Sequence, residues 1–122
     1  MSAPITTHVL DTAKGTPAVG VRITLDRDFS GSDALIVPTV AWERVGETTT
    51  NQDGRGPGLT ASLQLQSGLY RVVFYTQDYF DGQGVPTFYP YVEIIFRIVD
   101  PQQHYHIPLL ISPYGYSTYR GS

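Results

Sequence analysis

Apolar and polar side chains alternate along several stretches of this chain, and this period of two constrains the fold more than any other feature. The alternation is plainest over residues 19–25, 63–66, 70–74 and 92–98. Successive side chains of a β-strand point to opposite faces of a sheet, so each stretch predicts a strand with one buried and one solvated face. No window of eleven residues carries a comparable apolar stripe at helical spacing. We therefore expect an all-β fold.

Glycine and proline separate these stretches. The chain contains 12 glycines and 9 prolines, and turn-forming residues cluster at 53–58 and 112–115. Seven to eight short strands fit between the turns, a pattern that modestly favours a two-sheet β-sandwich over a barrel. One short helix is expected near Thr76 to Gly82. With 122 residues, of which 41% are hydrophobic, the chain can bury one core, so residues 1–122 are expected to form a single domain.

Charge and cysteine content exclude several classes of function. The formal net charge of -3 gives no basic field that would attract nucleic acid. Because cysteine is absent, no disulfide, thiolate nucleophile or thiolate-bound metal is available. No stretch approaches the length of a membrane-spanning helix, and no secretory signal pattern opens the chain. We expect a cytoplasmic protein that binds neither nucleic acid nor membrane, or a peroxisomal one in a eukaryotic host, although its last residues are not a serine-lysine-leucine address.

The strand expected over residues 104–111 carries the clearest candidate chemistry. Its odd positions are all aromatic or aliphatic and should face the core, which leaves His104, His106 and Pro108 on the opposite face. A face that carries two imidazoles differs from an ordinary solvated surface. A lone histidine on a strand is nevertheless more often structural than catalytic.

Three chemistries fit these histidines. They could bind zinc together with His8 and leave one position for water. They could act in a serine-histidine-acid arrangement with Ser112 or Ser117 and Asp11, although no nucleophile-elbow motif is present. The third option is metal-free activation of water by histidine, with an arginine that stabilises negative charge.

Four segments, spread over nearly the whole chain, form a specific pattern. They are THVLDTA at 7–13 with Gly15 and Pro17-Ala18, TNQDGR at 50–55, HYHIPLL at 104–110 and SPYGYSTYRGS at 112–122. In this order they resemble the 5-hydroxyisourate hydrolases of the transthyretin-like family. The most specific part is Tyr119-Arg120-Gly121-Ser122, which ends the chain as it ends those enzymes and separates them from the hormone-carrying transthyretins.

The resemblance implies a transthyretin-like two-sheet β-sandwich with one short helix. It implies a homotetramer, a dimer of dimers, with active sites where the dimers meet around a central channel. The implied reaction is hydrolysis of 5-hydroxyisourate to 2-oxo-4-hydroxy-4-carboxy-5-ureidoimidazoline in urate degradation, a part of purine metabolism, with no metal or other cofactor. Carried over residue by residue, the catalytic set falls on His8, Arg55 and His106, and the substrate-binding set on Tyr119, Arg120, Gly121 and Ser122.

In the mechanism that we hypothesise, His8 or His106 accepts a proton from a water molecule that attacks a ring carbonyl of the substrate. Arg55 holds the polarised oxygen atoms with its fork of donors. Which histidine is the base stays open, and His104 is expected to have at most a supporting role. Residues 28–39 are longer than the corresponding family segment and are expected to form an extended connection.

Two noncatalytic alternatives remain. The first is a transthyretin-like carrier of a small ligand, because one fold can serve several functions. His8, Arg55 and His106 make a site that is too polar for an apolar ligand, which argues against this alternative. The second is an interaction module whose aromatic side chains serve a protein partner.

Overall fold

The computed structural model describes residues 4–30, 41–61 and 63–121. Within these ranges the elements are β1 (Ile5–Asp11), β2 (Thr16–Pro17), β3 (Arg22–Asp28), β4 (Trp42–Thr49), β5 (Gly68–Phe74), α1 (Thr76–Asp81), β6 (Val92–Ile98), β7 (Tyr105–Ser112) and β8 (Gly115–Thr118). The expected all-β fold with one short helix is confirmed. No helix in these ranges is long and apolar enough to cross a membrane.

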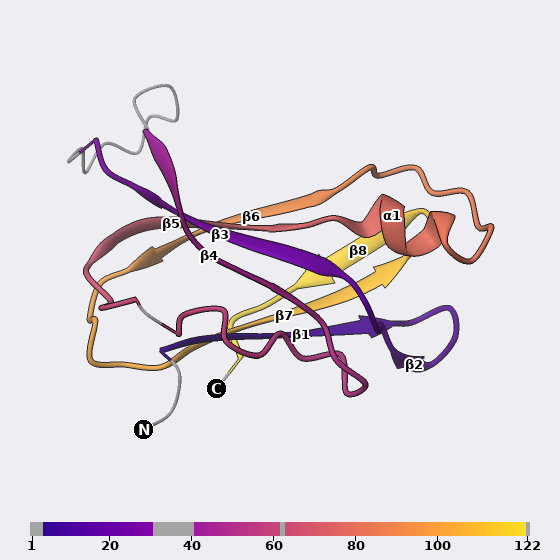
Figure 1. The fold of residues 1–122 in the computed structure, drawn as a ribbon, viewed down its shortest axis with the longest axis horizontal. Helices are drawn as coiled ribbons and strands as arrows, with labels where there is room; N and C mark the ends of the chain where they lie inside the picture. The colour runs from indigo at the N-terminus through magenta and orange to yellow at the C-terminus, as the bar shows by residue number, and fades with distance from the viewer. Residues whose placement is uncertain (1–3, 31–40, 62, 122) are drawn as a thin grey trace.

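The strands form two four-stranded sheets that pack as layers of a sandwich (Figure 1). The strand order is β2-β1-β7-β8 in the first sheet and β4-β3-β5-β6 in the second. All pairings are antiparallel except that of β1 with β7, which is parallel. This one parallel pair joins the beginning of the chain to its last quarter, and it decides which residues meet at the site described below.

The core lies between the two sheets. In β7 the side chains of Tyr105, Ile107, Leu109 and Ile111 are buried, as the alternation predicted. The second sheet contributes buried side chains from β3, β5 and β6. Burying one large apolar side chain stabilises a fold by about 1.5–3 kcal/mol, so this interleaved layer provides most of the driving force for folding.

Two of the local strand predictions were wrong. Val19 is 42% exposed instead of facing the core, because the chain turns at Gly20, whose φ is 83°, and β3 begins only at Arg22. Residues 63–66 form no strand. The backbone N–H of Leu63 instead bonds the carbonyl of Thr60 in a turn. Alternation alone cannot detect such breaks, because a turn can also direct alternate side chains toward the core without pairing with a neighbouring strand.

The long segment expected over residues 28–39 is described only at its start. Asp28 ends β3, and its carboxylate accepts hydrogen bonds from the backbone N–H groups of Ser30 and Ala41. These backbone hydrogen bonds lower the pKa of Asp28. The remainder of the segment, from residue 31 on, lies outside the described residues.

Candidate active site

The outer face of the first sheet carries two of the three histidines on its central strands. In the parallel register of β1 and β7, Thr6 lies opposite His106, and His8 follows two residues further along β1. The alternate residues of β1, Thr7 and Val9, are buried. Because side chains two residues apart share one face of a strand, Thr6, His8 and His106 lie together on the outer face.

The turn at residues 51–55 packs directly on this face. The backbone N–H of Val9 donates to the carbonyl of Gly54 at 2.7 Å, and His8 and Arg55 form an isolated antiparallel bridge. Gly54 has a φ of 77°, and a Cβ at this position would collide with the carbonyl oxygen of Val9. Only glycine therefore lets the turn come so close to β1.

A single side chain organises that turn. The Oδ1 atom of Asn51 accepts hydrogen bonds from the backbone N–H groups of Asp53 at 2.9 Å and Arg55 at 3.1 Å. The backbone N–H of Asn51 returns a bond to the carbonyl of Arg55 at 2.8 Å. The turn thus fixes the backbone from which the guanidinium of Arg55 extends.

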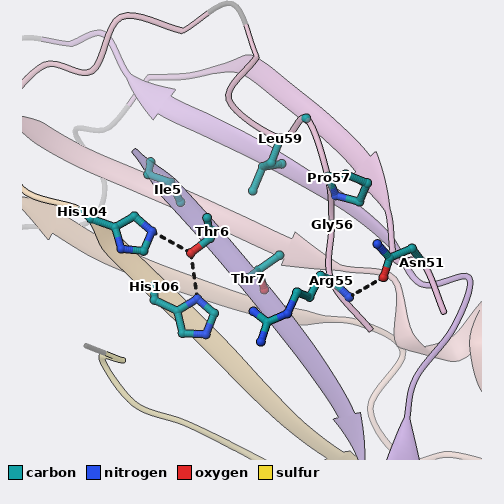
Figure 2. Close-up of a pocket in the computed structure, with 11 residues that line it drawn as sticks. Ile5, Thr6, Thr7, Asn51, Arg55, Gly56, Pro57, Leu59, His104 and His106 are labelled. Atoms are coloured by element: carbon teal, nitrogen blue, oxygen red, sulfur yellow. Dashed lines mark hydrogen bonds between the residues drawn. The ribbon is translucent and has the colours of Figure 1, made fainter. Parts of the chain in front are cut away.

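These elements enclose a pocket of about 600 Å³. Figure 2 shows the guanidinium of Arg55 pointing toward the ring of His106 across this pocket. The pocket combines imidazole, guanidinium and hydroxyl groups with an apolar wall, and its lining residues are Ile5, Thr6, Thr7, Asn51, Arg55, Gly56, Pro57, Gly58, Leu59, His104 and His106. His8 is not among them, although it lies beside Arg55.

Hydrogen bonds restrict the proton positions on His8 and His106. The Nε2 atom of His8 lies 2.7 Å from the carbonyl oxygen of Asp53. A carbonyl can only accept, so this nitrogen carries the proton and donates it. The Nδ1 atom of His106 lies 2.8 Å from the hydroxyl of Thr6. Within the described part of the chain, no hydrogen bond reaches Nε2 of His106, which leaves this nitrogen available to a ligand.

The surroundings of His106 favour its neutral form. Partial burial is the main cause that lowers the pKa of His106 from its ordinary value of 6.5, followed by the charges of Arg55, His104 and His8. Burial penalises the charged ring and the nearby cation repels it. The neutral form of His106, which can accept a proton, is therefore favoured.

The end of the chain continues alongside β7. The backbone N–H of Gly121 donates to the carbonyl of His106 at 2.8 Å. This bridge keeps the register of the β7–β8 pair, in which Thr118 lies opposite Leu109. The continued alternation places Arg120 on the side of β7 that carries Tyr105.

The sequence-predicted tail residues therefore do not all gather at the pocket. Gly121 lies against the His106 ring, but the guanidinium of Arg120 stacks 4.6 Å from the ring centroid of Tyr105 and donates to Gln103 at 2.9 Å. Tyr119 and Arg120 line a separate hollow between the edges of the two sheets. Ser122 lies outside the described residues.

Two residues at the pocket were absent from the predicted set. Thr6 bonds two histidine rings, and Asn51 holds the Arg55 turn. The signal for Thr6 was present in the sequence, because a residue two positions before His8 must share its face of the strand. The role of Asn51 depends on the shape of the turn, for which the sequence offers only the neighbouring Asp53-Gly54 pair.

The geometry of the three histidines differs from that of a metal centre. Among residues 4–30, 41–61 and 63–121, no three histidine, cysteine or acidic side chains are placed so that they could hold a metal ion together. One nitrogen of His8 is also engaged by the Asp53 carbonyl. The arrangement instead suits water activation by imidazole beside a fixed cation.

Fold and site together define a transthyretin-like sandwich with a histidine-arginine pocket on the outer face of one sheet. The chain belongs to the HIUase/Transthyretin family, whose model matches residues 5–121. It is 46% identical to the 5-hydroxyisourate hydrolase of Mus musculus, over 99% of this chain and 97% of that protein. It is 48% identical to the 5-hydroxyisourate hydrolase of Mesorhizobium japonicum, over 97% of this chain and 91% of that protein. The resemblance inferred from the sequence is thus confirmed.

Solved structures agree on the fold. The 5-hydroxyisourate hydrolase of Klebsiella pneumoniae matches with a TM-score of 0.78 and 34% identity, over 97% of this chain and 92% of that chain. Sea bream transthyretin in complex with thyroxine matches with a TM-score of 0.83 and 29% identity, over 98% of this chain and 95% of that chain. Backbone similarity therefore does not separate the two functions, and the side chains of the pocket must do so.

Proposed function

We propose that this chain hydrolyses 5-hydroxyisourate to 2-oxo-4-hydroxy-4-carboxy-5-ureidoimidazoline. The observation that carries the proposal is the partly buried His106, held neutral beside the guanidinium of Arg55 in a pocket open to a ligand. The full-length similarity to hydrolases from Mus musculus and Mesorhizobium japonicum supports the choice of substrate.

His106 is the better candidate for the general base. Its Nε2 atom has no partner within the described residues, whereas Nε2 of His8 already donates to a backbone carbonyl. In the proposed step, Nε2 of His106 takes a proton from water while the water oxygen bonds to a ring carbonyl carbon. The ring C–N bond then breaks, and the protonated imidazole returns its proton to the leaving nitrogen. General-base assistance of this kind is typically worth about 100- to 10,000-fold in rate.

Arg55 stabilises the charge that develops in this step. The carbonyl oxygen becomes an oxyanion when water adds, and a guanidinium offers it two parallel N–H donors. The Asn51 turn fixes the backbone of Arg55 before substrate arrives. Arg55 therefore loses little conformational freedom during the reaction. His8 lies beside Arg55, and we propose that its remaining nitrogen, Nδ1, accepts a hydrogen bond from a substrate N–H or hydroxyl group.

The 119–122 tail completes the proposed site. The position of Gly121 against the His106 ring supports a role for the tail in binding substrate through its backbone. Arg120 would act by anchoring the tail to Tyr105 and Gln103. We further propose a cytoplasmic homotetramer, in which a second copy covers the outer face of the first sheet and excludes water from the pocket.

Decay of freshly prepared 5-hydroxyisourate, followed by ultraviolet absorbance, tests the proposed function. The wild type and the control variant Arg22→Lys, which changes an exposed arginine of β3, should accelerate the decay equally. Arg55→Lys should reduce kcat/KM by about 100- to 1,000-fold, as expected for loss of one preorganised donor group. A wild-type rate equal to the spontaneous rate would reject the hydrolase. Thyroxine binding measured in parallel would then test the carrier function suggested by the sea bream structure.

A further inference from the structure

The hydroxyl group of Thr6 is hydrogen-bonded to two histidine rings among the residues that line the pocket. The Oγ1 atom of Thr6 lies 2.9 Å from Nε2 of His104 and 2.8 Å from Nδ1 of His106. Figure 2 shows Thr6 between the two rings, which are nearly parallel with centroids 6.4 Å apart. The three side chains therefore form one continuous hydrogen-bonded unit.

A hydroxyl carries one hydrogen, which limits how the unit can be protonated. While both hydrogen bonds persist, Thr6 either donates to one ring nitrogen and accepts from the other, or accepts from both rings through its two lone pairs. If Thr6 donates to His104, then Nδ1 of His106 carries a proton and its Nε2 lone pair is free. If Thr6 donates to His106, then Nδ1 accepts and, in the neutral ring, the proton of His106 sits on Nε2. Only an arrangement in which Thr6 accepts from Nδ1 of His106 leaves this ring able to accept a proton from water.

We propose that Thr6 is a positioning residue that fixes the ring orientation and the tautomer of His106. This inference rests on the proposed role of His106 as the base. When Thr6 accepts from Nδ1 of His106, the Nε2 lone pair of that ring is free to take a proton from water.

Within the described residues, the His106 ring is hydrogen-bonded to Thr6, and the charged groups that face the ring lie on other elements. Arg55 approaches from the 51–58 loop and His8 from β1, and both act on His106 through charge. From the tail, Gly121 contacts the ring without a charge, and Arg120 is engaged by Tyr105. Thr6 is therefore the group whose hydrogen bond can set the orientation of the His106 ring.

The variants Thr6→Val and Thr6→Ser test the inference. Valine keeps the branched shape of threonine on the strand and removes the hydroxyl, whereas serine keeps the hydroxyl. We expect Thr6→Val to lower kcat for 5-hydroxyisourate about tenfold with KM changed less than about twofold, and Thr6→Ser to restore most of kcat, since a net hydrogen bond is worth about 0.5–1.5 kcal/mol. The matched control is Thr12→Val, whose hydroxyl bonds the carbonyl of Ile111 and touches no histidine.

A nitrogen-15 NMR spectrum of the histidine rings supplies a readout that a packing defect would not move. Near pH 7.5 we expect a single His106 tautomer protonated at Nδ1 in the wild type and in Thr6→Ser, and a mixture with the Nε2–H tautomer in Thr6→Val.

An unchanged tautomer in Thr6→Val would overturn the inference, and so would wild-type kcat in that variant. A fall in kcat without a change of tautomer would also overturn it, because it would indicate a structural role. If the wild type fails to accelerate 5-hydroxyisourate decay, the proposed function fails, whereas the tautomers still decide whether Thr6 fixes the protonated nitrogen of His106.

Discussion

Gly121 lies so close to His106 that no side chain fits between them. Its backbone N–H donates to the His106 carbonyl at 2.8 Å, and a Cβ at Gly121 would lie 2.5 Å from Cδ2 of the imidazole. The tail of the chain thus forms one wall against the ring of the proposed base. A change at this glycine should act on catalysis through the position of that ring.

Gly121→Ala should therefore impair activity more than stability. The added methyl group must push the His106 ring aside, and a displacement of about 1 Å can cost about 100-fold in rate. We expect kcat/KM for 5-hydroxyisourate to fall by about 10- to 100-fold while Tm changes by only a few degrees. The control is Gly82→Ala, where a Cβ would meet only ordinary contacts of 3.5 Å. Equal activity of the two variants would refute the proposed arrangement.

Arg55→Met should change the pH dependence of the enzyme as well as its rate. The cation beside His106 lowers the pKa of this ring after burial does, so its removal should raise that pKa. The base is lost when His106 is protonated, and the acid limb of kcat/KM should therefore move to higher pH in the variant. NMR titration of His106 together with the pH-rate profile measures both effects. A limb that stays in place, or moves to lower pH, would show that Arg55 does not act on His106.

Gly54→Ala should destabilise the turn that carries Arg55. Alanine there incurs the cost of a positive φ and also collides with the carbonyl of Val9. Gly15→Ala provides the matched comparison, because its φ of 72° is similar and nothing lies within 4 Å of the added Cβ. We expect Gly15→Ala to cost about 1–2 kcal/mol in the free energy of unfolding, and Gly54→Ala to cost at least about 1 kcal/mol more. Urea unfolding measures both, and equal losses would mean that the turn does not depend on close packing against β1.

The fold was largely predictable because burial imposes a period of two on strands. Residues such as Tyr105 and Ile107 were placed correctly on the inner face of β7, since a shift by one residue would expose the whole apolar set. The prediction failed at Val19 and Leu63, where local turns end the pairing while apolar residues continue. Neither break is encoded by alternation.

The site was less accessible to such reasoning. The proximity of His8, Arg55 and His106 depends on the parallel pairing of β1 with β7 and on the turn docked upon β1, and both bring together residues far apart in sequence. Composition and spacing left several chemistries open, and only the family resemblance pointed to His8, Arg55 and His106 as the catalytic residues. The direction of the Arg120 side chain follows from the register of the tail with β7, which only the structure supplies.

The most direct test of the account compares the wild type with His106→Gln in the decay of freshly prepared 5-hydroxyisourate at neutral pH. Glutamine keeps polar atoms near the pocket but cannot act as a base, and the lost assistance corresponds to about 100- to 10,000-fold in rate. We predict rapid decay with the wild type and a loss of this size in a variant that unfolds at a similar temperature. A folded His106→Gln protein with wild-type kcat/KM would contradict the assignment of His106 as the base.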